Sequence, residues 1–176
     1  MKHKCVDITK VDKFPEYDMI YCDPPWEQRM VRFFETQMKK QTGEVVENQI
    51  DEILSALGRL SSTDKPLFIE YSVKGSDRVI EIMKRYGHKH RQYVECTYSR
   101  NLTYAIMSFN TNAIMYDGKK ETQTLDLLID QIKPNVVFDP FAGIGVLAKA
   151  VNKKGVKYIG YEVNRARFER MIKIAK

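Results

Sequence analysis

The chain has 176 residues, of which 43% are hydrophobic and 30% are charged, and its formal net charge is +6. This length suits one domain with a sizeable core and is too short for two ordinary ones. The composition excludes a disordered chain, and no apolar stretch reaches the roughly 20 residues that span a bilayer. No apolar signal-peptide core follows the basic N-terminus, so we expect a single cytoplasmic domain over residues 1–176 without a membrane segment.

Cysteine and histidine usage argues against a metal site. Cys5, Cys22 and Cys96 are widely spaced in apolar or strand-like runs, which predicts buried free thiols rather than disulfides or zinc ligands. The three histidines have no cysteine or carboxylate at metal-ligand spacing, so we expect no metal. The positive net charge is compatible with a polyanionic partner but does not by itself indicate one.

The first two predicted elements are strands over 4–8 and 17–22, and the second leads directly into Asp23-Pro24-Pro25-Trp26. Two consecutive prolines end the strand, which places a carboxylate and an indole at its C-terminal end. In open α/β sheets, ligands bind at that edge. Taken alone, these four residues fit a proline turn with a capping aspartate and a surface tryptophan equally well.

Residues 27–45 mix basic and aromatic side chains, and Thr42-Gly43 interrupts any helix there. One interpretation is a short amphipathic helix followed by a surface loop. The other is a mobile segment that touches nucleic acid beside a site.

After residue 45 the apolar spacing predicts alternating helices and strands. In chain order these are a helix over 46–60, a strand over 66–73, a helix over 77–86, antiparallel strands over 91–98 and 111–116, a helix over 122–132, a strand over 135–139, a helix over 146–152, a strand over 156–161 and a terminal helix. The basic and aromatic residues of 88–110 fit either a solvated edge strand or a contact surface for nucleic acid.

A second candidate site follows the strand over 135–139. Gly143 and Gly145 permit a tight turn that a ligand can approach closely, and Glu162 ends the next strand, where a carboxylate can accept both hydroxyl hydrogens of a ribose. The full dinucleotide pattern is absent, because position 148 is alanine. Asp139 beside the glycines would repel a pyrophosphate and attract a cationic group, such as the sulfonium or amino group of S-adenosylmethionine.

Together the two motifs resemble those of a known enzyme family. Asp139-Pro-Phe-Ala-Gly-Ile-Gly145 is similar to the cofactor motif of S-adenosylmethionine-dependent amino-methyltransferases, and Asp23-Pro-Pro-Trp26 resembles their catalytic motif. The order, with the catalytic motif first, resembles the permuted β-class DNA adenine methyltransferases and their relatives that modify messenger RNA. The resemblance implies an α/β, Rossmann-like sheet of seven strands, mostly parallel with one antiparallel strand, and helices on both faces.

The resemblance also implies roles for individual residues. Asp23 and the Pro24 carbonyl would accept the hydrogens of an adenine amino group, Pro25 would stiffen the turn and Trp26 would stack on the base. The cofactor-binding residues implied for S-adenosylmethionine are Asp7 for the adenine amino group, Asp139 and Phe141 for the methionine end, Gly143 and Gly145 beneath it, and Glu162 for the ribose. Without the family, Asp7 is equally a solvated aspartate at a strand end.

The chain departs from the family in one respect: a target-recognition insertion is missing or reduced to a few residues around 99–112. Specificity would then be read by residues 27–45 and 88–110, by another copy of the chain or by a separate recognition subunit. We expect adenine methylation in DNA. The alternatives are adenine methylation in RNA, cytosine amino-methylation in DNA, and a non-catalytic subunit that binds nucleic acid.

Overall fold

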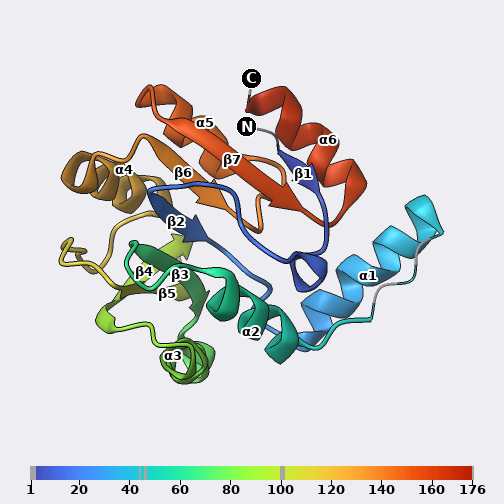
Figure 1. Cartoon of the computed structure of the whole chain (residues 1–176), viewed down its shortest axis with the longest axis horizontal. Helices are drawn as coiled ribbons and strands as arrows, with labels where there is room; N and C mark the ends of the chain where they lie inside the picture. The colour runs from blue at the N-terminus through green and yellow to red at the C-terminus, as the bar shows by residue number, and fades with distance from the viewer. Residues whose placement is uncertain (1–2, 44, 46, 100–101, 176) are drawn as a thin grey trace.

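A sheet forms the centre of the protein in the computed structural model, which describes residues 3–43, 45, 47–99 and 102–175 (Figure 1). Its described strands number seven, in the order β1-β7-β6-β2-β3-β5-β4. They are β1 (Lys4–Cys5), β2 (Met19–Cys22), β3 (Leu67–Ser72), β4 (His90–Ser99), β5 (Leu102–Phe109), β6 (Val136–Asp139) and β7 (Lys157–Glu162). β5 runs antiparallel to both of its neighbours, and the other pairings are parallel. The expected sheet, with one antiparallel strand, is confirmed.

Helices cover both faces of this sheet, as expected (Figure 1). The α-helices are α1 (Gln28–Thr42), α2 (Ile50–Leu60), α3 (Ser76–Arg85), α4 (Glu121–Ile132), α5 (Val146–Lys153) and α6 (Arg165–Ile174), with short 3-10 turns η1 (Ile8–Lys10) and η2 (Val73–Gly75). Buried residues of α1, α2 and α3 share one apolar cluster, and those of α4, α5 and α6 share another. None of the described helices has the length and apolar content that crossing a membrane requires.

The central strand β2 is buried on both sides. Ile20 and Cys22 pack into the cluster under α2 and α3, whereas Met19 and Tyr21 pack into the cluster under α4 and α5. This alternation explains the continuous apolar run in the sequence, because a parallel strand covered on both faces has no solvent side. β2 therefore fixes the position of Asp23, the residue that follows Cys22, in the fold.

The strand predicted over 111–116 is wrong. The partner of β4 is β5, which pairs from Leu102 to Phe109, and Asn110 ends it with a positive φ of 57°. The backbone beyond Asn110 bonds to side chains instead of a neighbouring strand: the Gln92 amide donates to the Met115 carbonyl and accepts from its N–H. Side-chain amides thus satisfy the groups that a strand would have paired.

Several other expectations need correction. β1 ends at Cys5 rather than residue 8, and the Cys5 thiol is exposed rather than buried. The helix expected from residue 46 begins at Ile50, and residue 46 itself lies outside the described part of the chain. Most of residues 27–45 form a helix: α1 ends at Thr42 and is capped by Gly43, whose φ of 74° is one that glycine adopts readily. Contact of this segment with nucleic acid stays a prediction.

Candidate active site

The Asp23 turn, residues Asp23 to Trp26, leaves the sheet at the carboxyl end of β2. β2 lies between β6 and β3, and the chain proceeds from β2 to β3 on one side and from β6 to β7 on the other. Connections that diverge in this way leave a crevice at the carboxyl edge of the sheet. Asp23 follows β2 and Asp139 ends β6, so carboxylates from two distant motifs meet at this crevice.

The side chains of the Asp23 turn are ordered by contacts within the protein. The Trp26 indole N–H donates to Asp23 Oδ1 at 2.6 Å. The Trp26 ring stacks on Tyr104 of β5, with 6.2 Å between ring centroids and 24° between ring planes. The buried Tyr104 therefore supports Trp26, and Trp26 in turn orients the Asp23 carboxylate.

Part of the Asp23 side chain is exposed at the crevice, and protein atoms surround its carboxyl group on the other sides. This loss of water raises the pKa of its carboxyl to about 7, and the nearby Glu121 carboxyl acts in the same direction. The hydrogen bond from Trp26 and the charge of Arg167 oppose that rise in pKa. A carboxyl with a pKa near neutrality can both carry charge and exchange a proton at physiological pH.

Replacing Trp26 with phenylalanine is expected to raise the pKa of Asp23 further. Phenylalanine keeps an aromatic ring for Tyr104 but lacks the N–H that favours the ionised carboxylate. Carbon-13 NMR titration of the Asp23 carboxyl in both proteins would measure the change. An unchanged or lowered pKa in the variant would show that the indole N–H does not act on Asp23.

The glycine turn, residues Asp139 to Gly145, follows β6. Asp139 is buried, and its two carboxylate oxygens accept hydrogen bonds from the Phe141 N–H and the Tyr158 hydroxyl, each at 2.9 Å. Burial raises the pKa of Asp139 to about 8. Gly143 and Gly145 have φ values of 54° and 89°, which explains why glycine occupies both positions. The glycine turn leads into α5. The hydrogen bond from the Phe141 N–H to Asp139 helps to fix the conformation of this turn.

Glu162 connects the end of β7 to the glycine turn. Its carboxylate accepts from the Gly143 N–H and from the Asn164 N–H, each at 2.8 Å. Burial raises the pKa of Glu162, while the Asn164 N–H and the Arg167 charge oppose the rise. The carboxylate thus holds the glycine turn in place and still borders the cavity described below.

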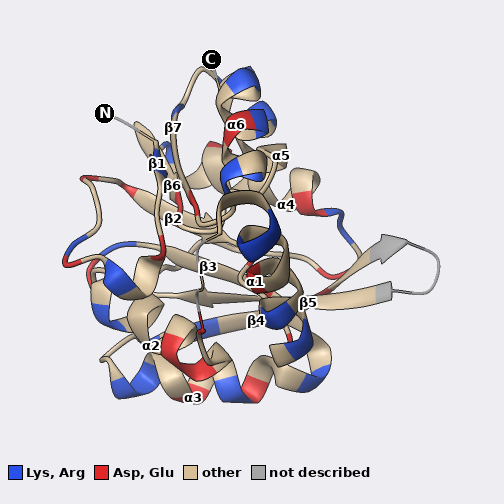
Figure 2. Cartoon of the chain, turned by 90° about the vertical axis from the view of Figure 1, so that its right-hand side faces the viewer, with Lys and Arg blue, Asp and Glu red and all other residues tan. Residues whose placement is uncertain are grey.

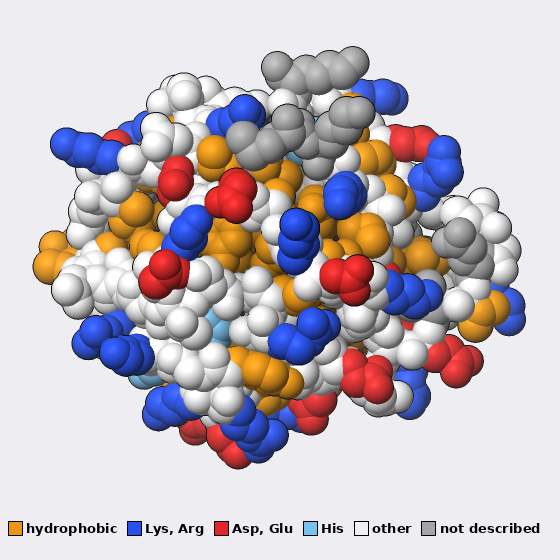
Figure 3. Space-filling view, viewed as in Figure 1, with side chains coloured by type: hydrophobic (Ala, Val, Ile, Leu, Met, Phe, Trp, Pro, Cys, Tyr) orange, Lys and Arg blue, Asp and Glu red, His pale blue; other side chains and the backbone are white. Residues whose placement is uncertain are grey.

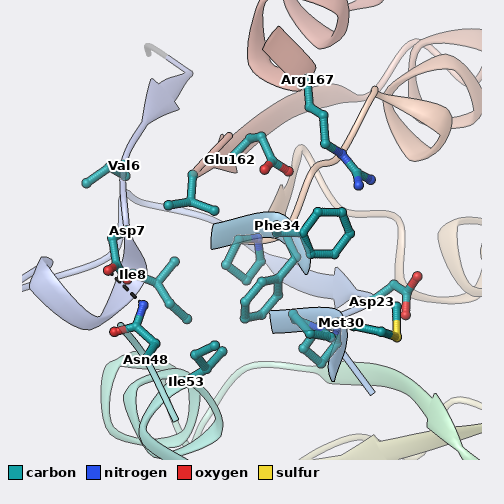
Figure 4. Close-up of a pocket in the computed structure, with 15 residues that line it drawn as sticks. Val6, Asp7, Ile8, Asp23, Met30, Phe34, Asn48, Ile53, Glu162 and Arg167 are labelled. Carbon is teal, nitrogen blue, oxygen red and sulfur yellow. Dashed lines mark hydrogen bonds between the residues drawn. The ribbon is translucent and has the colours of Figure 1, made fainter. Parts of the chain in front are cut away.

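Asp7 lies beyond β1 and caps η1. Its Oδ1 accepts from the Thr9 N–H and hydroxyl, and its Oδ2 accepts from the Asn48 side-chain amide at 2.9 Å. Asn48, which precedes α2, thereby holds the half-buried carboxylate at the edge of the cavity that both residues line (Figure 4).

One cavity, of about 140 Å³, brings many of these residues together (Figure 4). Of the residues expected at the site, the following line it: Asp7, Asp23, Pro24, Pro25, Phe141 and Glu162. In Figure 4, Asp7 and Asp23 lie at opposite ends of the cavity, and Glu162 lies between them. Trp26, Asp139 and Gly143 do not line the cavity but contact residues that do, whereas Gly145 lies against Met171 of α6.

Nine residues beyond the expected site residues line the same cavity: Val6, Ile8, Met30, Phe34, Asn48, Ile53, Pro140, Val163 and Arg167. Phe34 lies on α1, and its aromatic ring in a basic segment was the only signal available in the sequence. Arg167 lies one position before Phe168, in a helix whose apolar stripe predicts packing alone. Asn48 and Met30 carry no pattern that marks them.

In the described part of the chain, no three side chains of histidine, cysteine, aspartate or glutamate are placed to hold a metal ion. Asp23, Glu70, Glu121 and Asp139 nevertheless lie close enough to influence one another's ionisation. Glu70 is buried and accepts a hydrogen bond from the Tyr21 hydroxyl at 2.5 Å. The region around the Asp23 turn is therefore rich in carboxyl groups with few cations to balance them.

No family model and no curated protein sequence matches this chain. Solved structures do. TTHA0409, a proposed DNA modification methylase from Thermus thermophilus complexed with S-adenosyl-L-methionine, aligns with a TM-score of 0.66 and 14% identity over 97% of this chain and 90% of that one.

Two further structures align with similar quality. M1.HpyAVI, in complex with SAM, gives a TM-score of 0.59 at 15% identity over 90% of this chain and 88% of that one. The cytosine-N4-specific PvuII DNA methyltransferase gives 0.58 at 10% identity over 88% and 78%. These likenesses show that the chain has the Rossmann-like fold found in DNA methyltransferases.

Proposed function

We propose that this protein transfers a methyl group from S-adenosylmethionine to the exocyclic amino group of adenine in DNA. The observation that carries the proposal is the cavity at the switch point of the sheet. Along it Asp7, Glu162 and Asp23 follow one another, in the order in which an adenine, a ribose and a reactive sulfonium follow one another in this cofactor. The three structural neighbours described above are named as methylases or methyltransferases or were solved with this cofactor.

The residues present fit the cofactor by their chemistry. Asp7 has a carboxylate that can accept from an adenine amino group, and Glu162 can accept from ribose hydroxyls. Gly143 has no side chain, and the atoms nearest to the place of a Cβ belong to Arg167, so a ligand can approach this backbone once that side chain moves. Asp139 remains a predicted contact for the methionine end, although its oxygens already bond to Phe141 and Tyr158. When bound, the cofactor would supply an electrophilic methyl group.

The Asp23 turn suits an amino-group acceptor. An adenine amino nitrogen is a poor nucleophile, because its lone pair is delocalised into the ring. Asp23 and the Pro24 carbonyl would accept its two hydrogens and favour the tetrahedral nitrogen that develops as it attacks. The methylated nitrogen then releases one proton, and Asp23, with a pKa near 7, can accept it. Trp26 would stack on a base that has left the helix and offset part of its unstacking cost.

The nucleic acid would approach across α1. Exposed basic side chains on this helix include Arg32, Lys39 and Lys40, and Figure 2 shows basic groups along it. Lys89 and Arg91 are exposed at the start of β4 and its approach, whereas Arg100 lies outside the described residues. The face in Figure 3 intersperses acidic with basic side chains around apolar ones, so positive charge is not concentrated there. Contact through 27–45 and 88–110, and a second copy or recognition subunit, remain predictions.

Cytosine is the second candidate base. One of the structural neighbours is cytosine-N4-specific, and the exocyclic amino group of cytosine poses the same chemical problem as that of adenine. Asp23 favours adenine by the family resemblance, in which the cytosine enzymes more often carry serine at this position. RNA is the alternative polymer, because the same transfer chemistry acts on an adenine amino group in either polymer.

The purified chain should incorporate label from methyl-labelled S-adenosylmethionine into duplex or single-stranded DNA. Matched assays would use RNA of the same sequence and DNA lacking either adenine or cytosine. Digestion to nucleosides and mass analysis would identify the product, which we expect to be N6-methyladenine in DNA.

Other products would redirect the assignment. If only RNA is labelled, RNA replaces DNA as the proposed substrate. If the product is N4-methylcytosine, cytosine replaces adenine as the proposed base. If calorimetry detects cofactor binding but no nucleic acid becomes labelled, the non-catalytic nucleic-acid-binding subunit becomes the better explanation.

A further inference from the structure

Arg167 is a cationic side chain that lines the cavity and forms no ion pair with any residue that the structure describes. It lies in the first turns of α6, is half-buried, and its Nε is buried with no hydrogen-bond partner. Its Nη2 lies 2.8 Å from the position that a Cβ on Gly143 would occupy, so the guanidinium lies across the glycine turn. No ion pair of Arg167 is present among the described residues, although six other pairs are.

The guanidinium instead faces an aromatic ring from another helix. Its central carbon lies 4.6 Å from the centroid of the Phe34 ring on α1, which is cation–π geometry. Figure 4 shows Arg167 pointing from α6 toward Phe34, beside Glu162. This contact joins α1 to α6 across the cavity.

Arg167 and Phe34, which contact each other, both line a small cavity. Its volume of about 140 Å³ is below the roughly 300–1,000 Å³ typical of small-molecule sites. Separation of the Phe34 ring and the guanidinium would widen this cavity for a nucleoside-sized ligand. Arg167 lies in the first turn of α6 and Phe34 lies near the middle of α1, and rotation about side-chain bonds can separate them without moving the sheet.

Arg167 is the only cationic side chain among the described residues that line the cavity. The cavity also contains the carboxylates of Asp7, Asp23 and Glu162, and the charge of Arg167 acts on the last two. A ligand with a carboxylate of its own would face repulsion from all three. An unpaired guanidinium is the group that can compensate, because its N–H fork matches a carboxylate with two parallel hydrogen bonds.

We infer that Arg167 releases Phe34 when S-adenosylmethionine binds and pairs with the carboxylate of its methionine part. The inference rests on the proposed function, since it assumes that this cofactor occupies the cavity. Position supports it: Arg167 lies beside Glu162 and over Gly143, between the ribose end of the cavity and Asp23 (Figure 4). The amino-acid part of the cofactor is attached at the sulfonium and therefore extends from that region.

Binding of two cofactor forms by calorimetry tests the inference. Decarboxylated S-adenosylmethionine lacks only the carboxylate, so it retains the adenine, the ribose and the sulfonium. We expect the unmodified chain to prefer the complete cofactor. Arg167→Gln should weaken binding of the complete cofactor about tenfold to a hundredfold and leave binding of the decarboxylated form nearly unchanged. Arg167→Lys should retain part of the preference.

Two comparisons separate this role from general damage. Arg170→Gln removes an exposed guanidinium from the same helix and should change neither affinity. Phe34→Leu removes the ring that holds Arg167 and should speed association of both cofactor forms while preserving the preference. Circular dichroism would confirm that each variant is folded.

The outcomes are distinguishable. Equal weakening of both forms by Arg167→Gln would reduce Arg167 to a structural residue and overturn the inference alone. Unchanged cofactor binding with weakened DNA binding would assign the guanidinium to a phosphate and also overturn it. If the unmodified chain binds neither cofactor form, the proposed function and this inference both fail.

Discussion

Replacing Asp23 with alanine is expected to abolish methyl transfer while S-adenosylmethionine still binds. Asp23 is at the end of the cavity opposite Asp7, and the residues proposed for the adenine and ribose are untouched by the change (Figure 4). Loss of one preorganised partner for a developing charge typically costs about 10²–10³ in turnover. Loss of the proton acceptor adds to this. Labelled-cofactor turnover and calorimetric cofactor affinity, measured on the same preparation, would separate the two effects.

Asp23→Asn and Asp12→Ala complete the Asp23 experiment. Asparagine keeps one oxygen acceptor but cannot take a proton, so we expect it to be inactive near neutral pH as well. Asp12 is exposed and is not among the residues that line the cavity, so its replacement should leave turnover unchanged. Unchanged turnover in Asp23→Ala would remove Asp23 from the mechanism, and lost cofactor binding would place it in the cofactor site instead.

The asparagine variant should also be no less stable than the unmodified chain. A carboxyl whose folded-state pKa is raised to about 7 binds more protons in the folded protein than in the unfolded one. The contribution of Asp23 to the free energy of unfolding therefore falls as pH rises from about 4 to about 7. Asparagine does not titrate, so its contribution does not change with pH. At pH 7 the Asp23→Asn variant should therefore unfold at a temperature no lower than that of the unmodified chain.

Replacing Glu162 is expected to impair cofactor binding and stability together. Glu162→Ala leaves the buried N–H groups of Gly143 and Asn164 without their acceptor, and each unsatisfied group costs about 1–3 kcal/mol. The glycine turn would lose the contact that holds it beside β7. We expect calorimetry to show a loss of affinity of at least about tenfold, and urea unfolding to show a lower free energy of unfolding.

Glu162→Gln separates these two effects. Glutamine can keep one of the two hydrogen bonds, so it should retain more stability than alanine while still losing the charge that suits ribose hydroxyls. Glu169→Gln is the matched control on α6: its ion pair with Arg165 is exposed, and such pairs contribute little. If Glu162→Gln binds S-adenosylmethionine as tightly as the unmodified chain, Glu162 serves the turn and not the cofactor.

Residues that belong to one local pattern were predictable from the sequence. The run before Asp23 is apolar without alternation, and β2 is buried on both faces because helices cover both sides of the sheet. Gly143 and Gly145 occupy a turn with positive φ values, for which side chains other than glycine carry a steric cost. Glu162 ends its strand as expected and lines the cavity.

Residues whose role depends on distant partners could not be predicted in this way. Residues 102–109 read as an irregular connection, yet they form β5, because the strand's pairing with both β3 and β4 overrides its weak local pattern. Asp7 is turned by Asn48, which lies 41 residues away in sequence. Arg167 and Phe34 lie on helices at opposite ends of the chain, and only packing brings the guanidinium to the ring.

By itself, the sequence determined the class of fold, the order of its two motifs and the carboxylate that each motif places at a strand end. These features are predictable because strand periodicity, prolines and glycines act over a few residues. Only the tertiary structure decided that Asp7, Glu162 and Asp23 border one cavity, that Asp139 is enclosed rather than exposed to it, and that Arg167 enters it. These outcomes depend on which strands pair and which helices pack together, and such contacts join residues far apart in the chain.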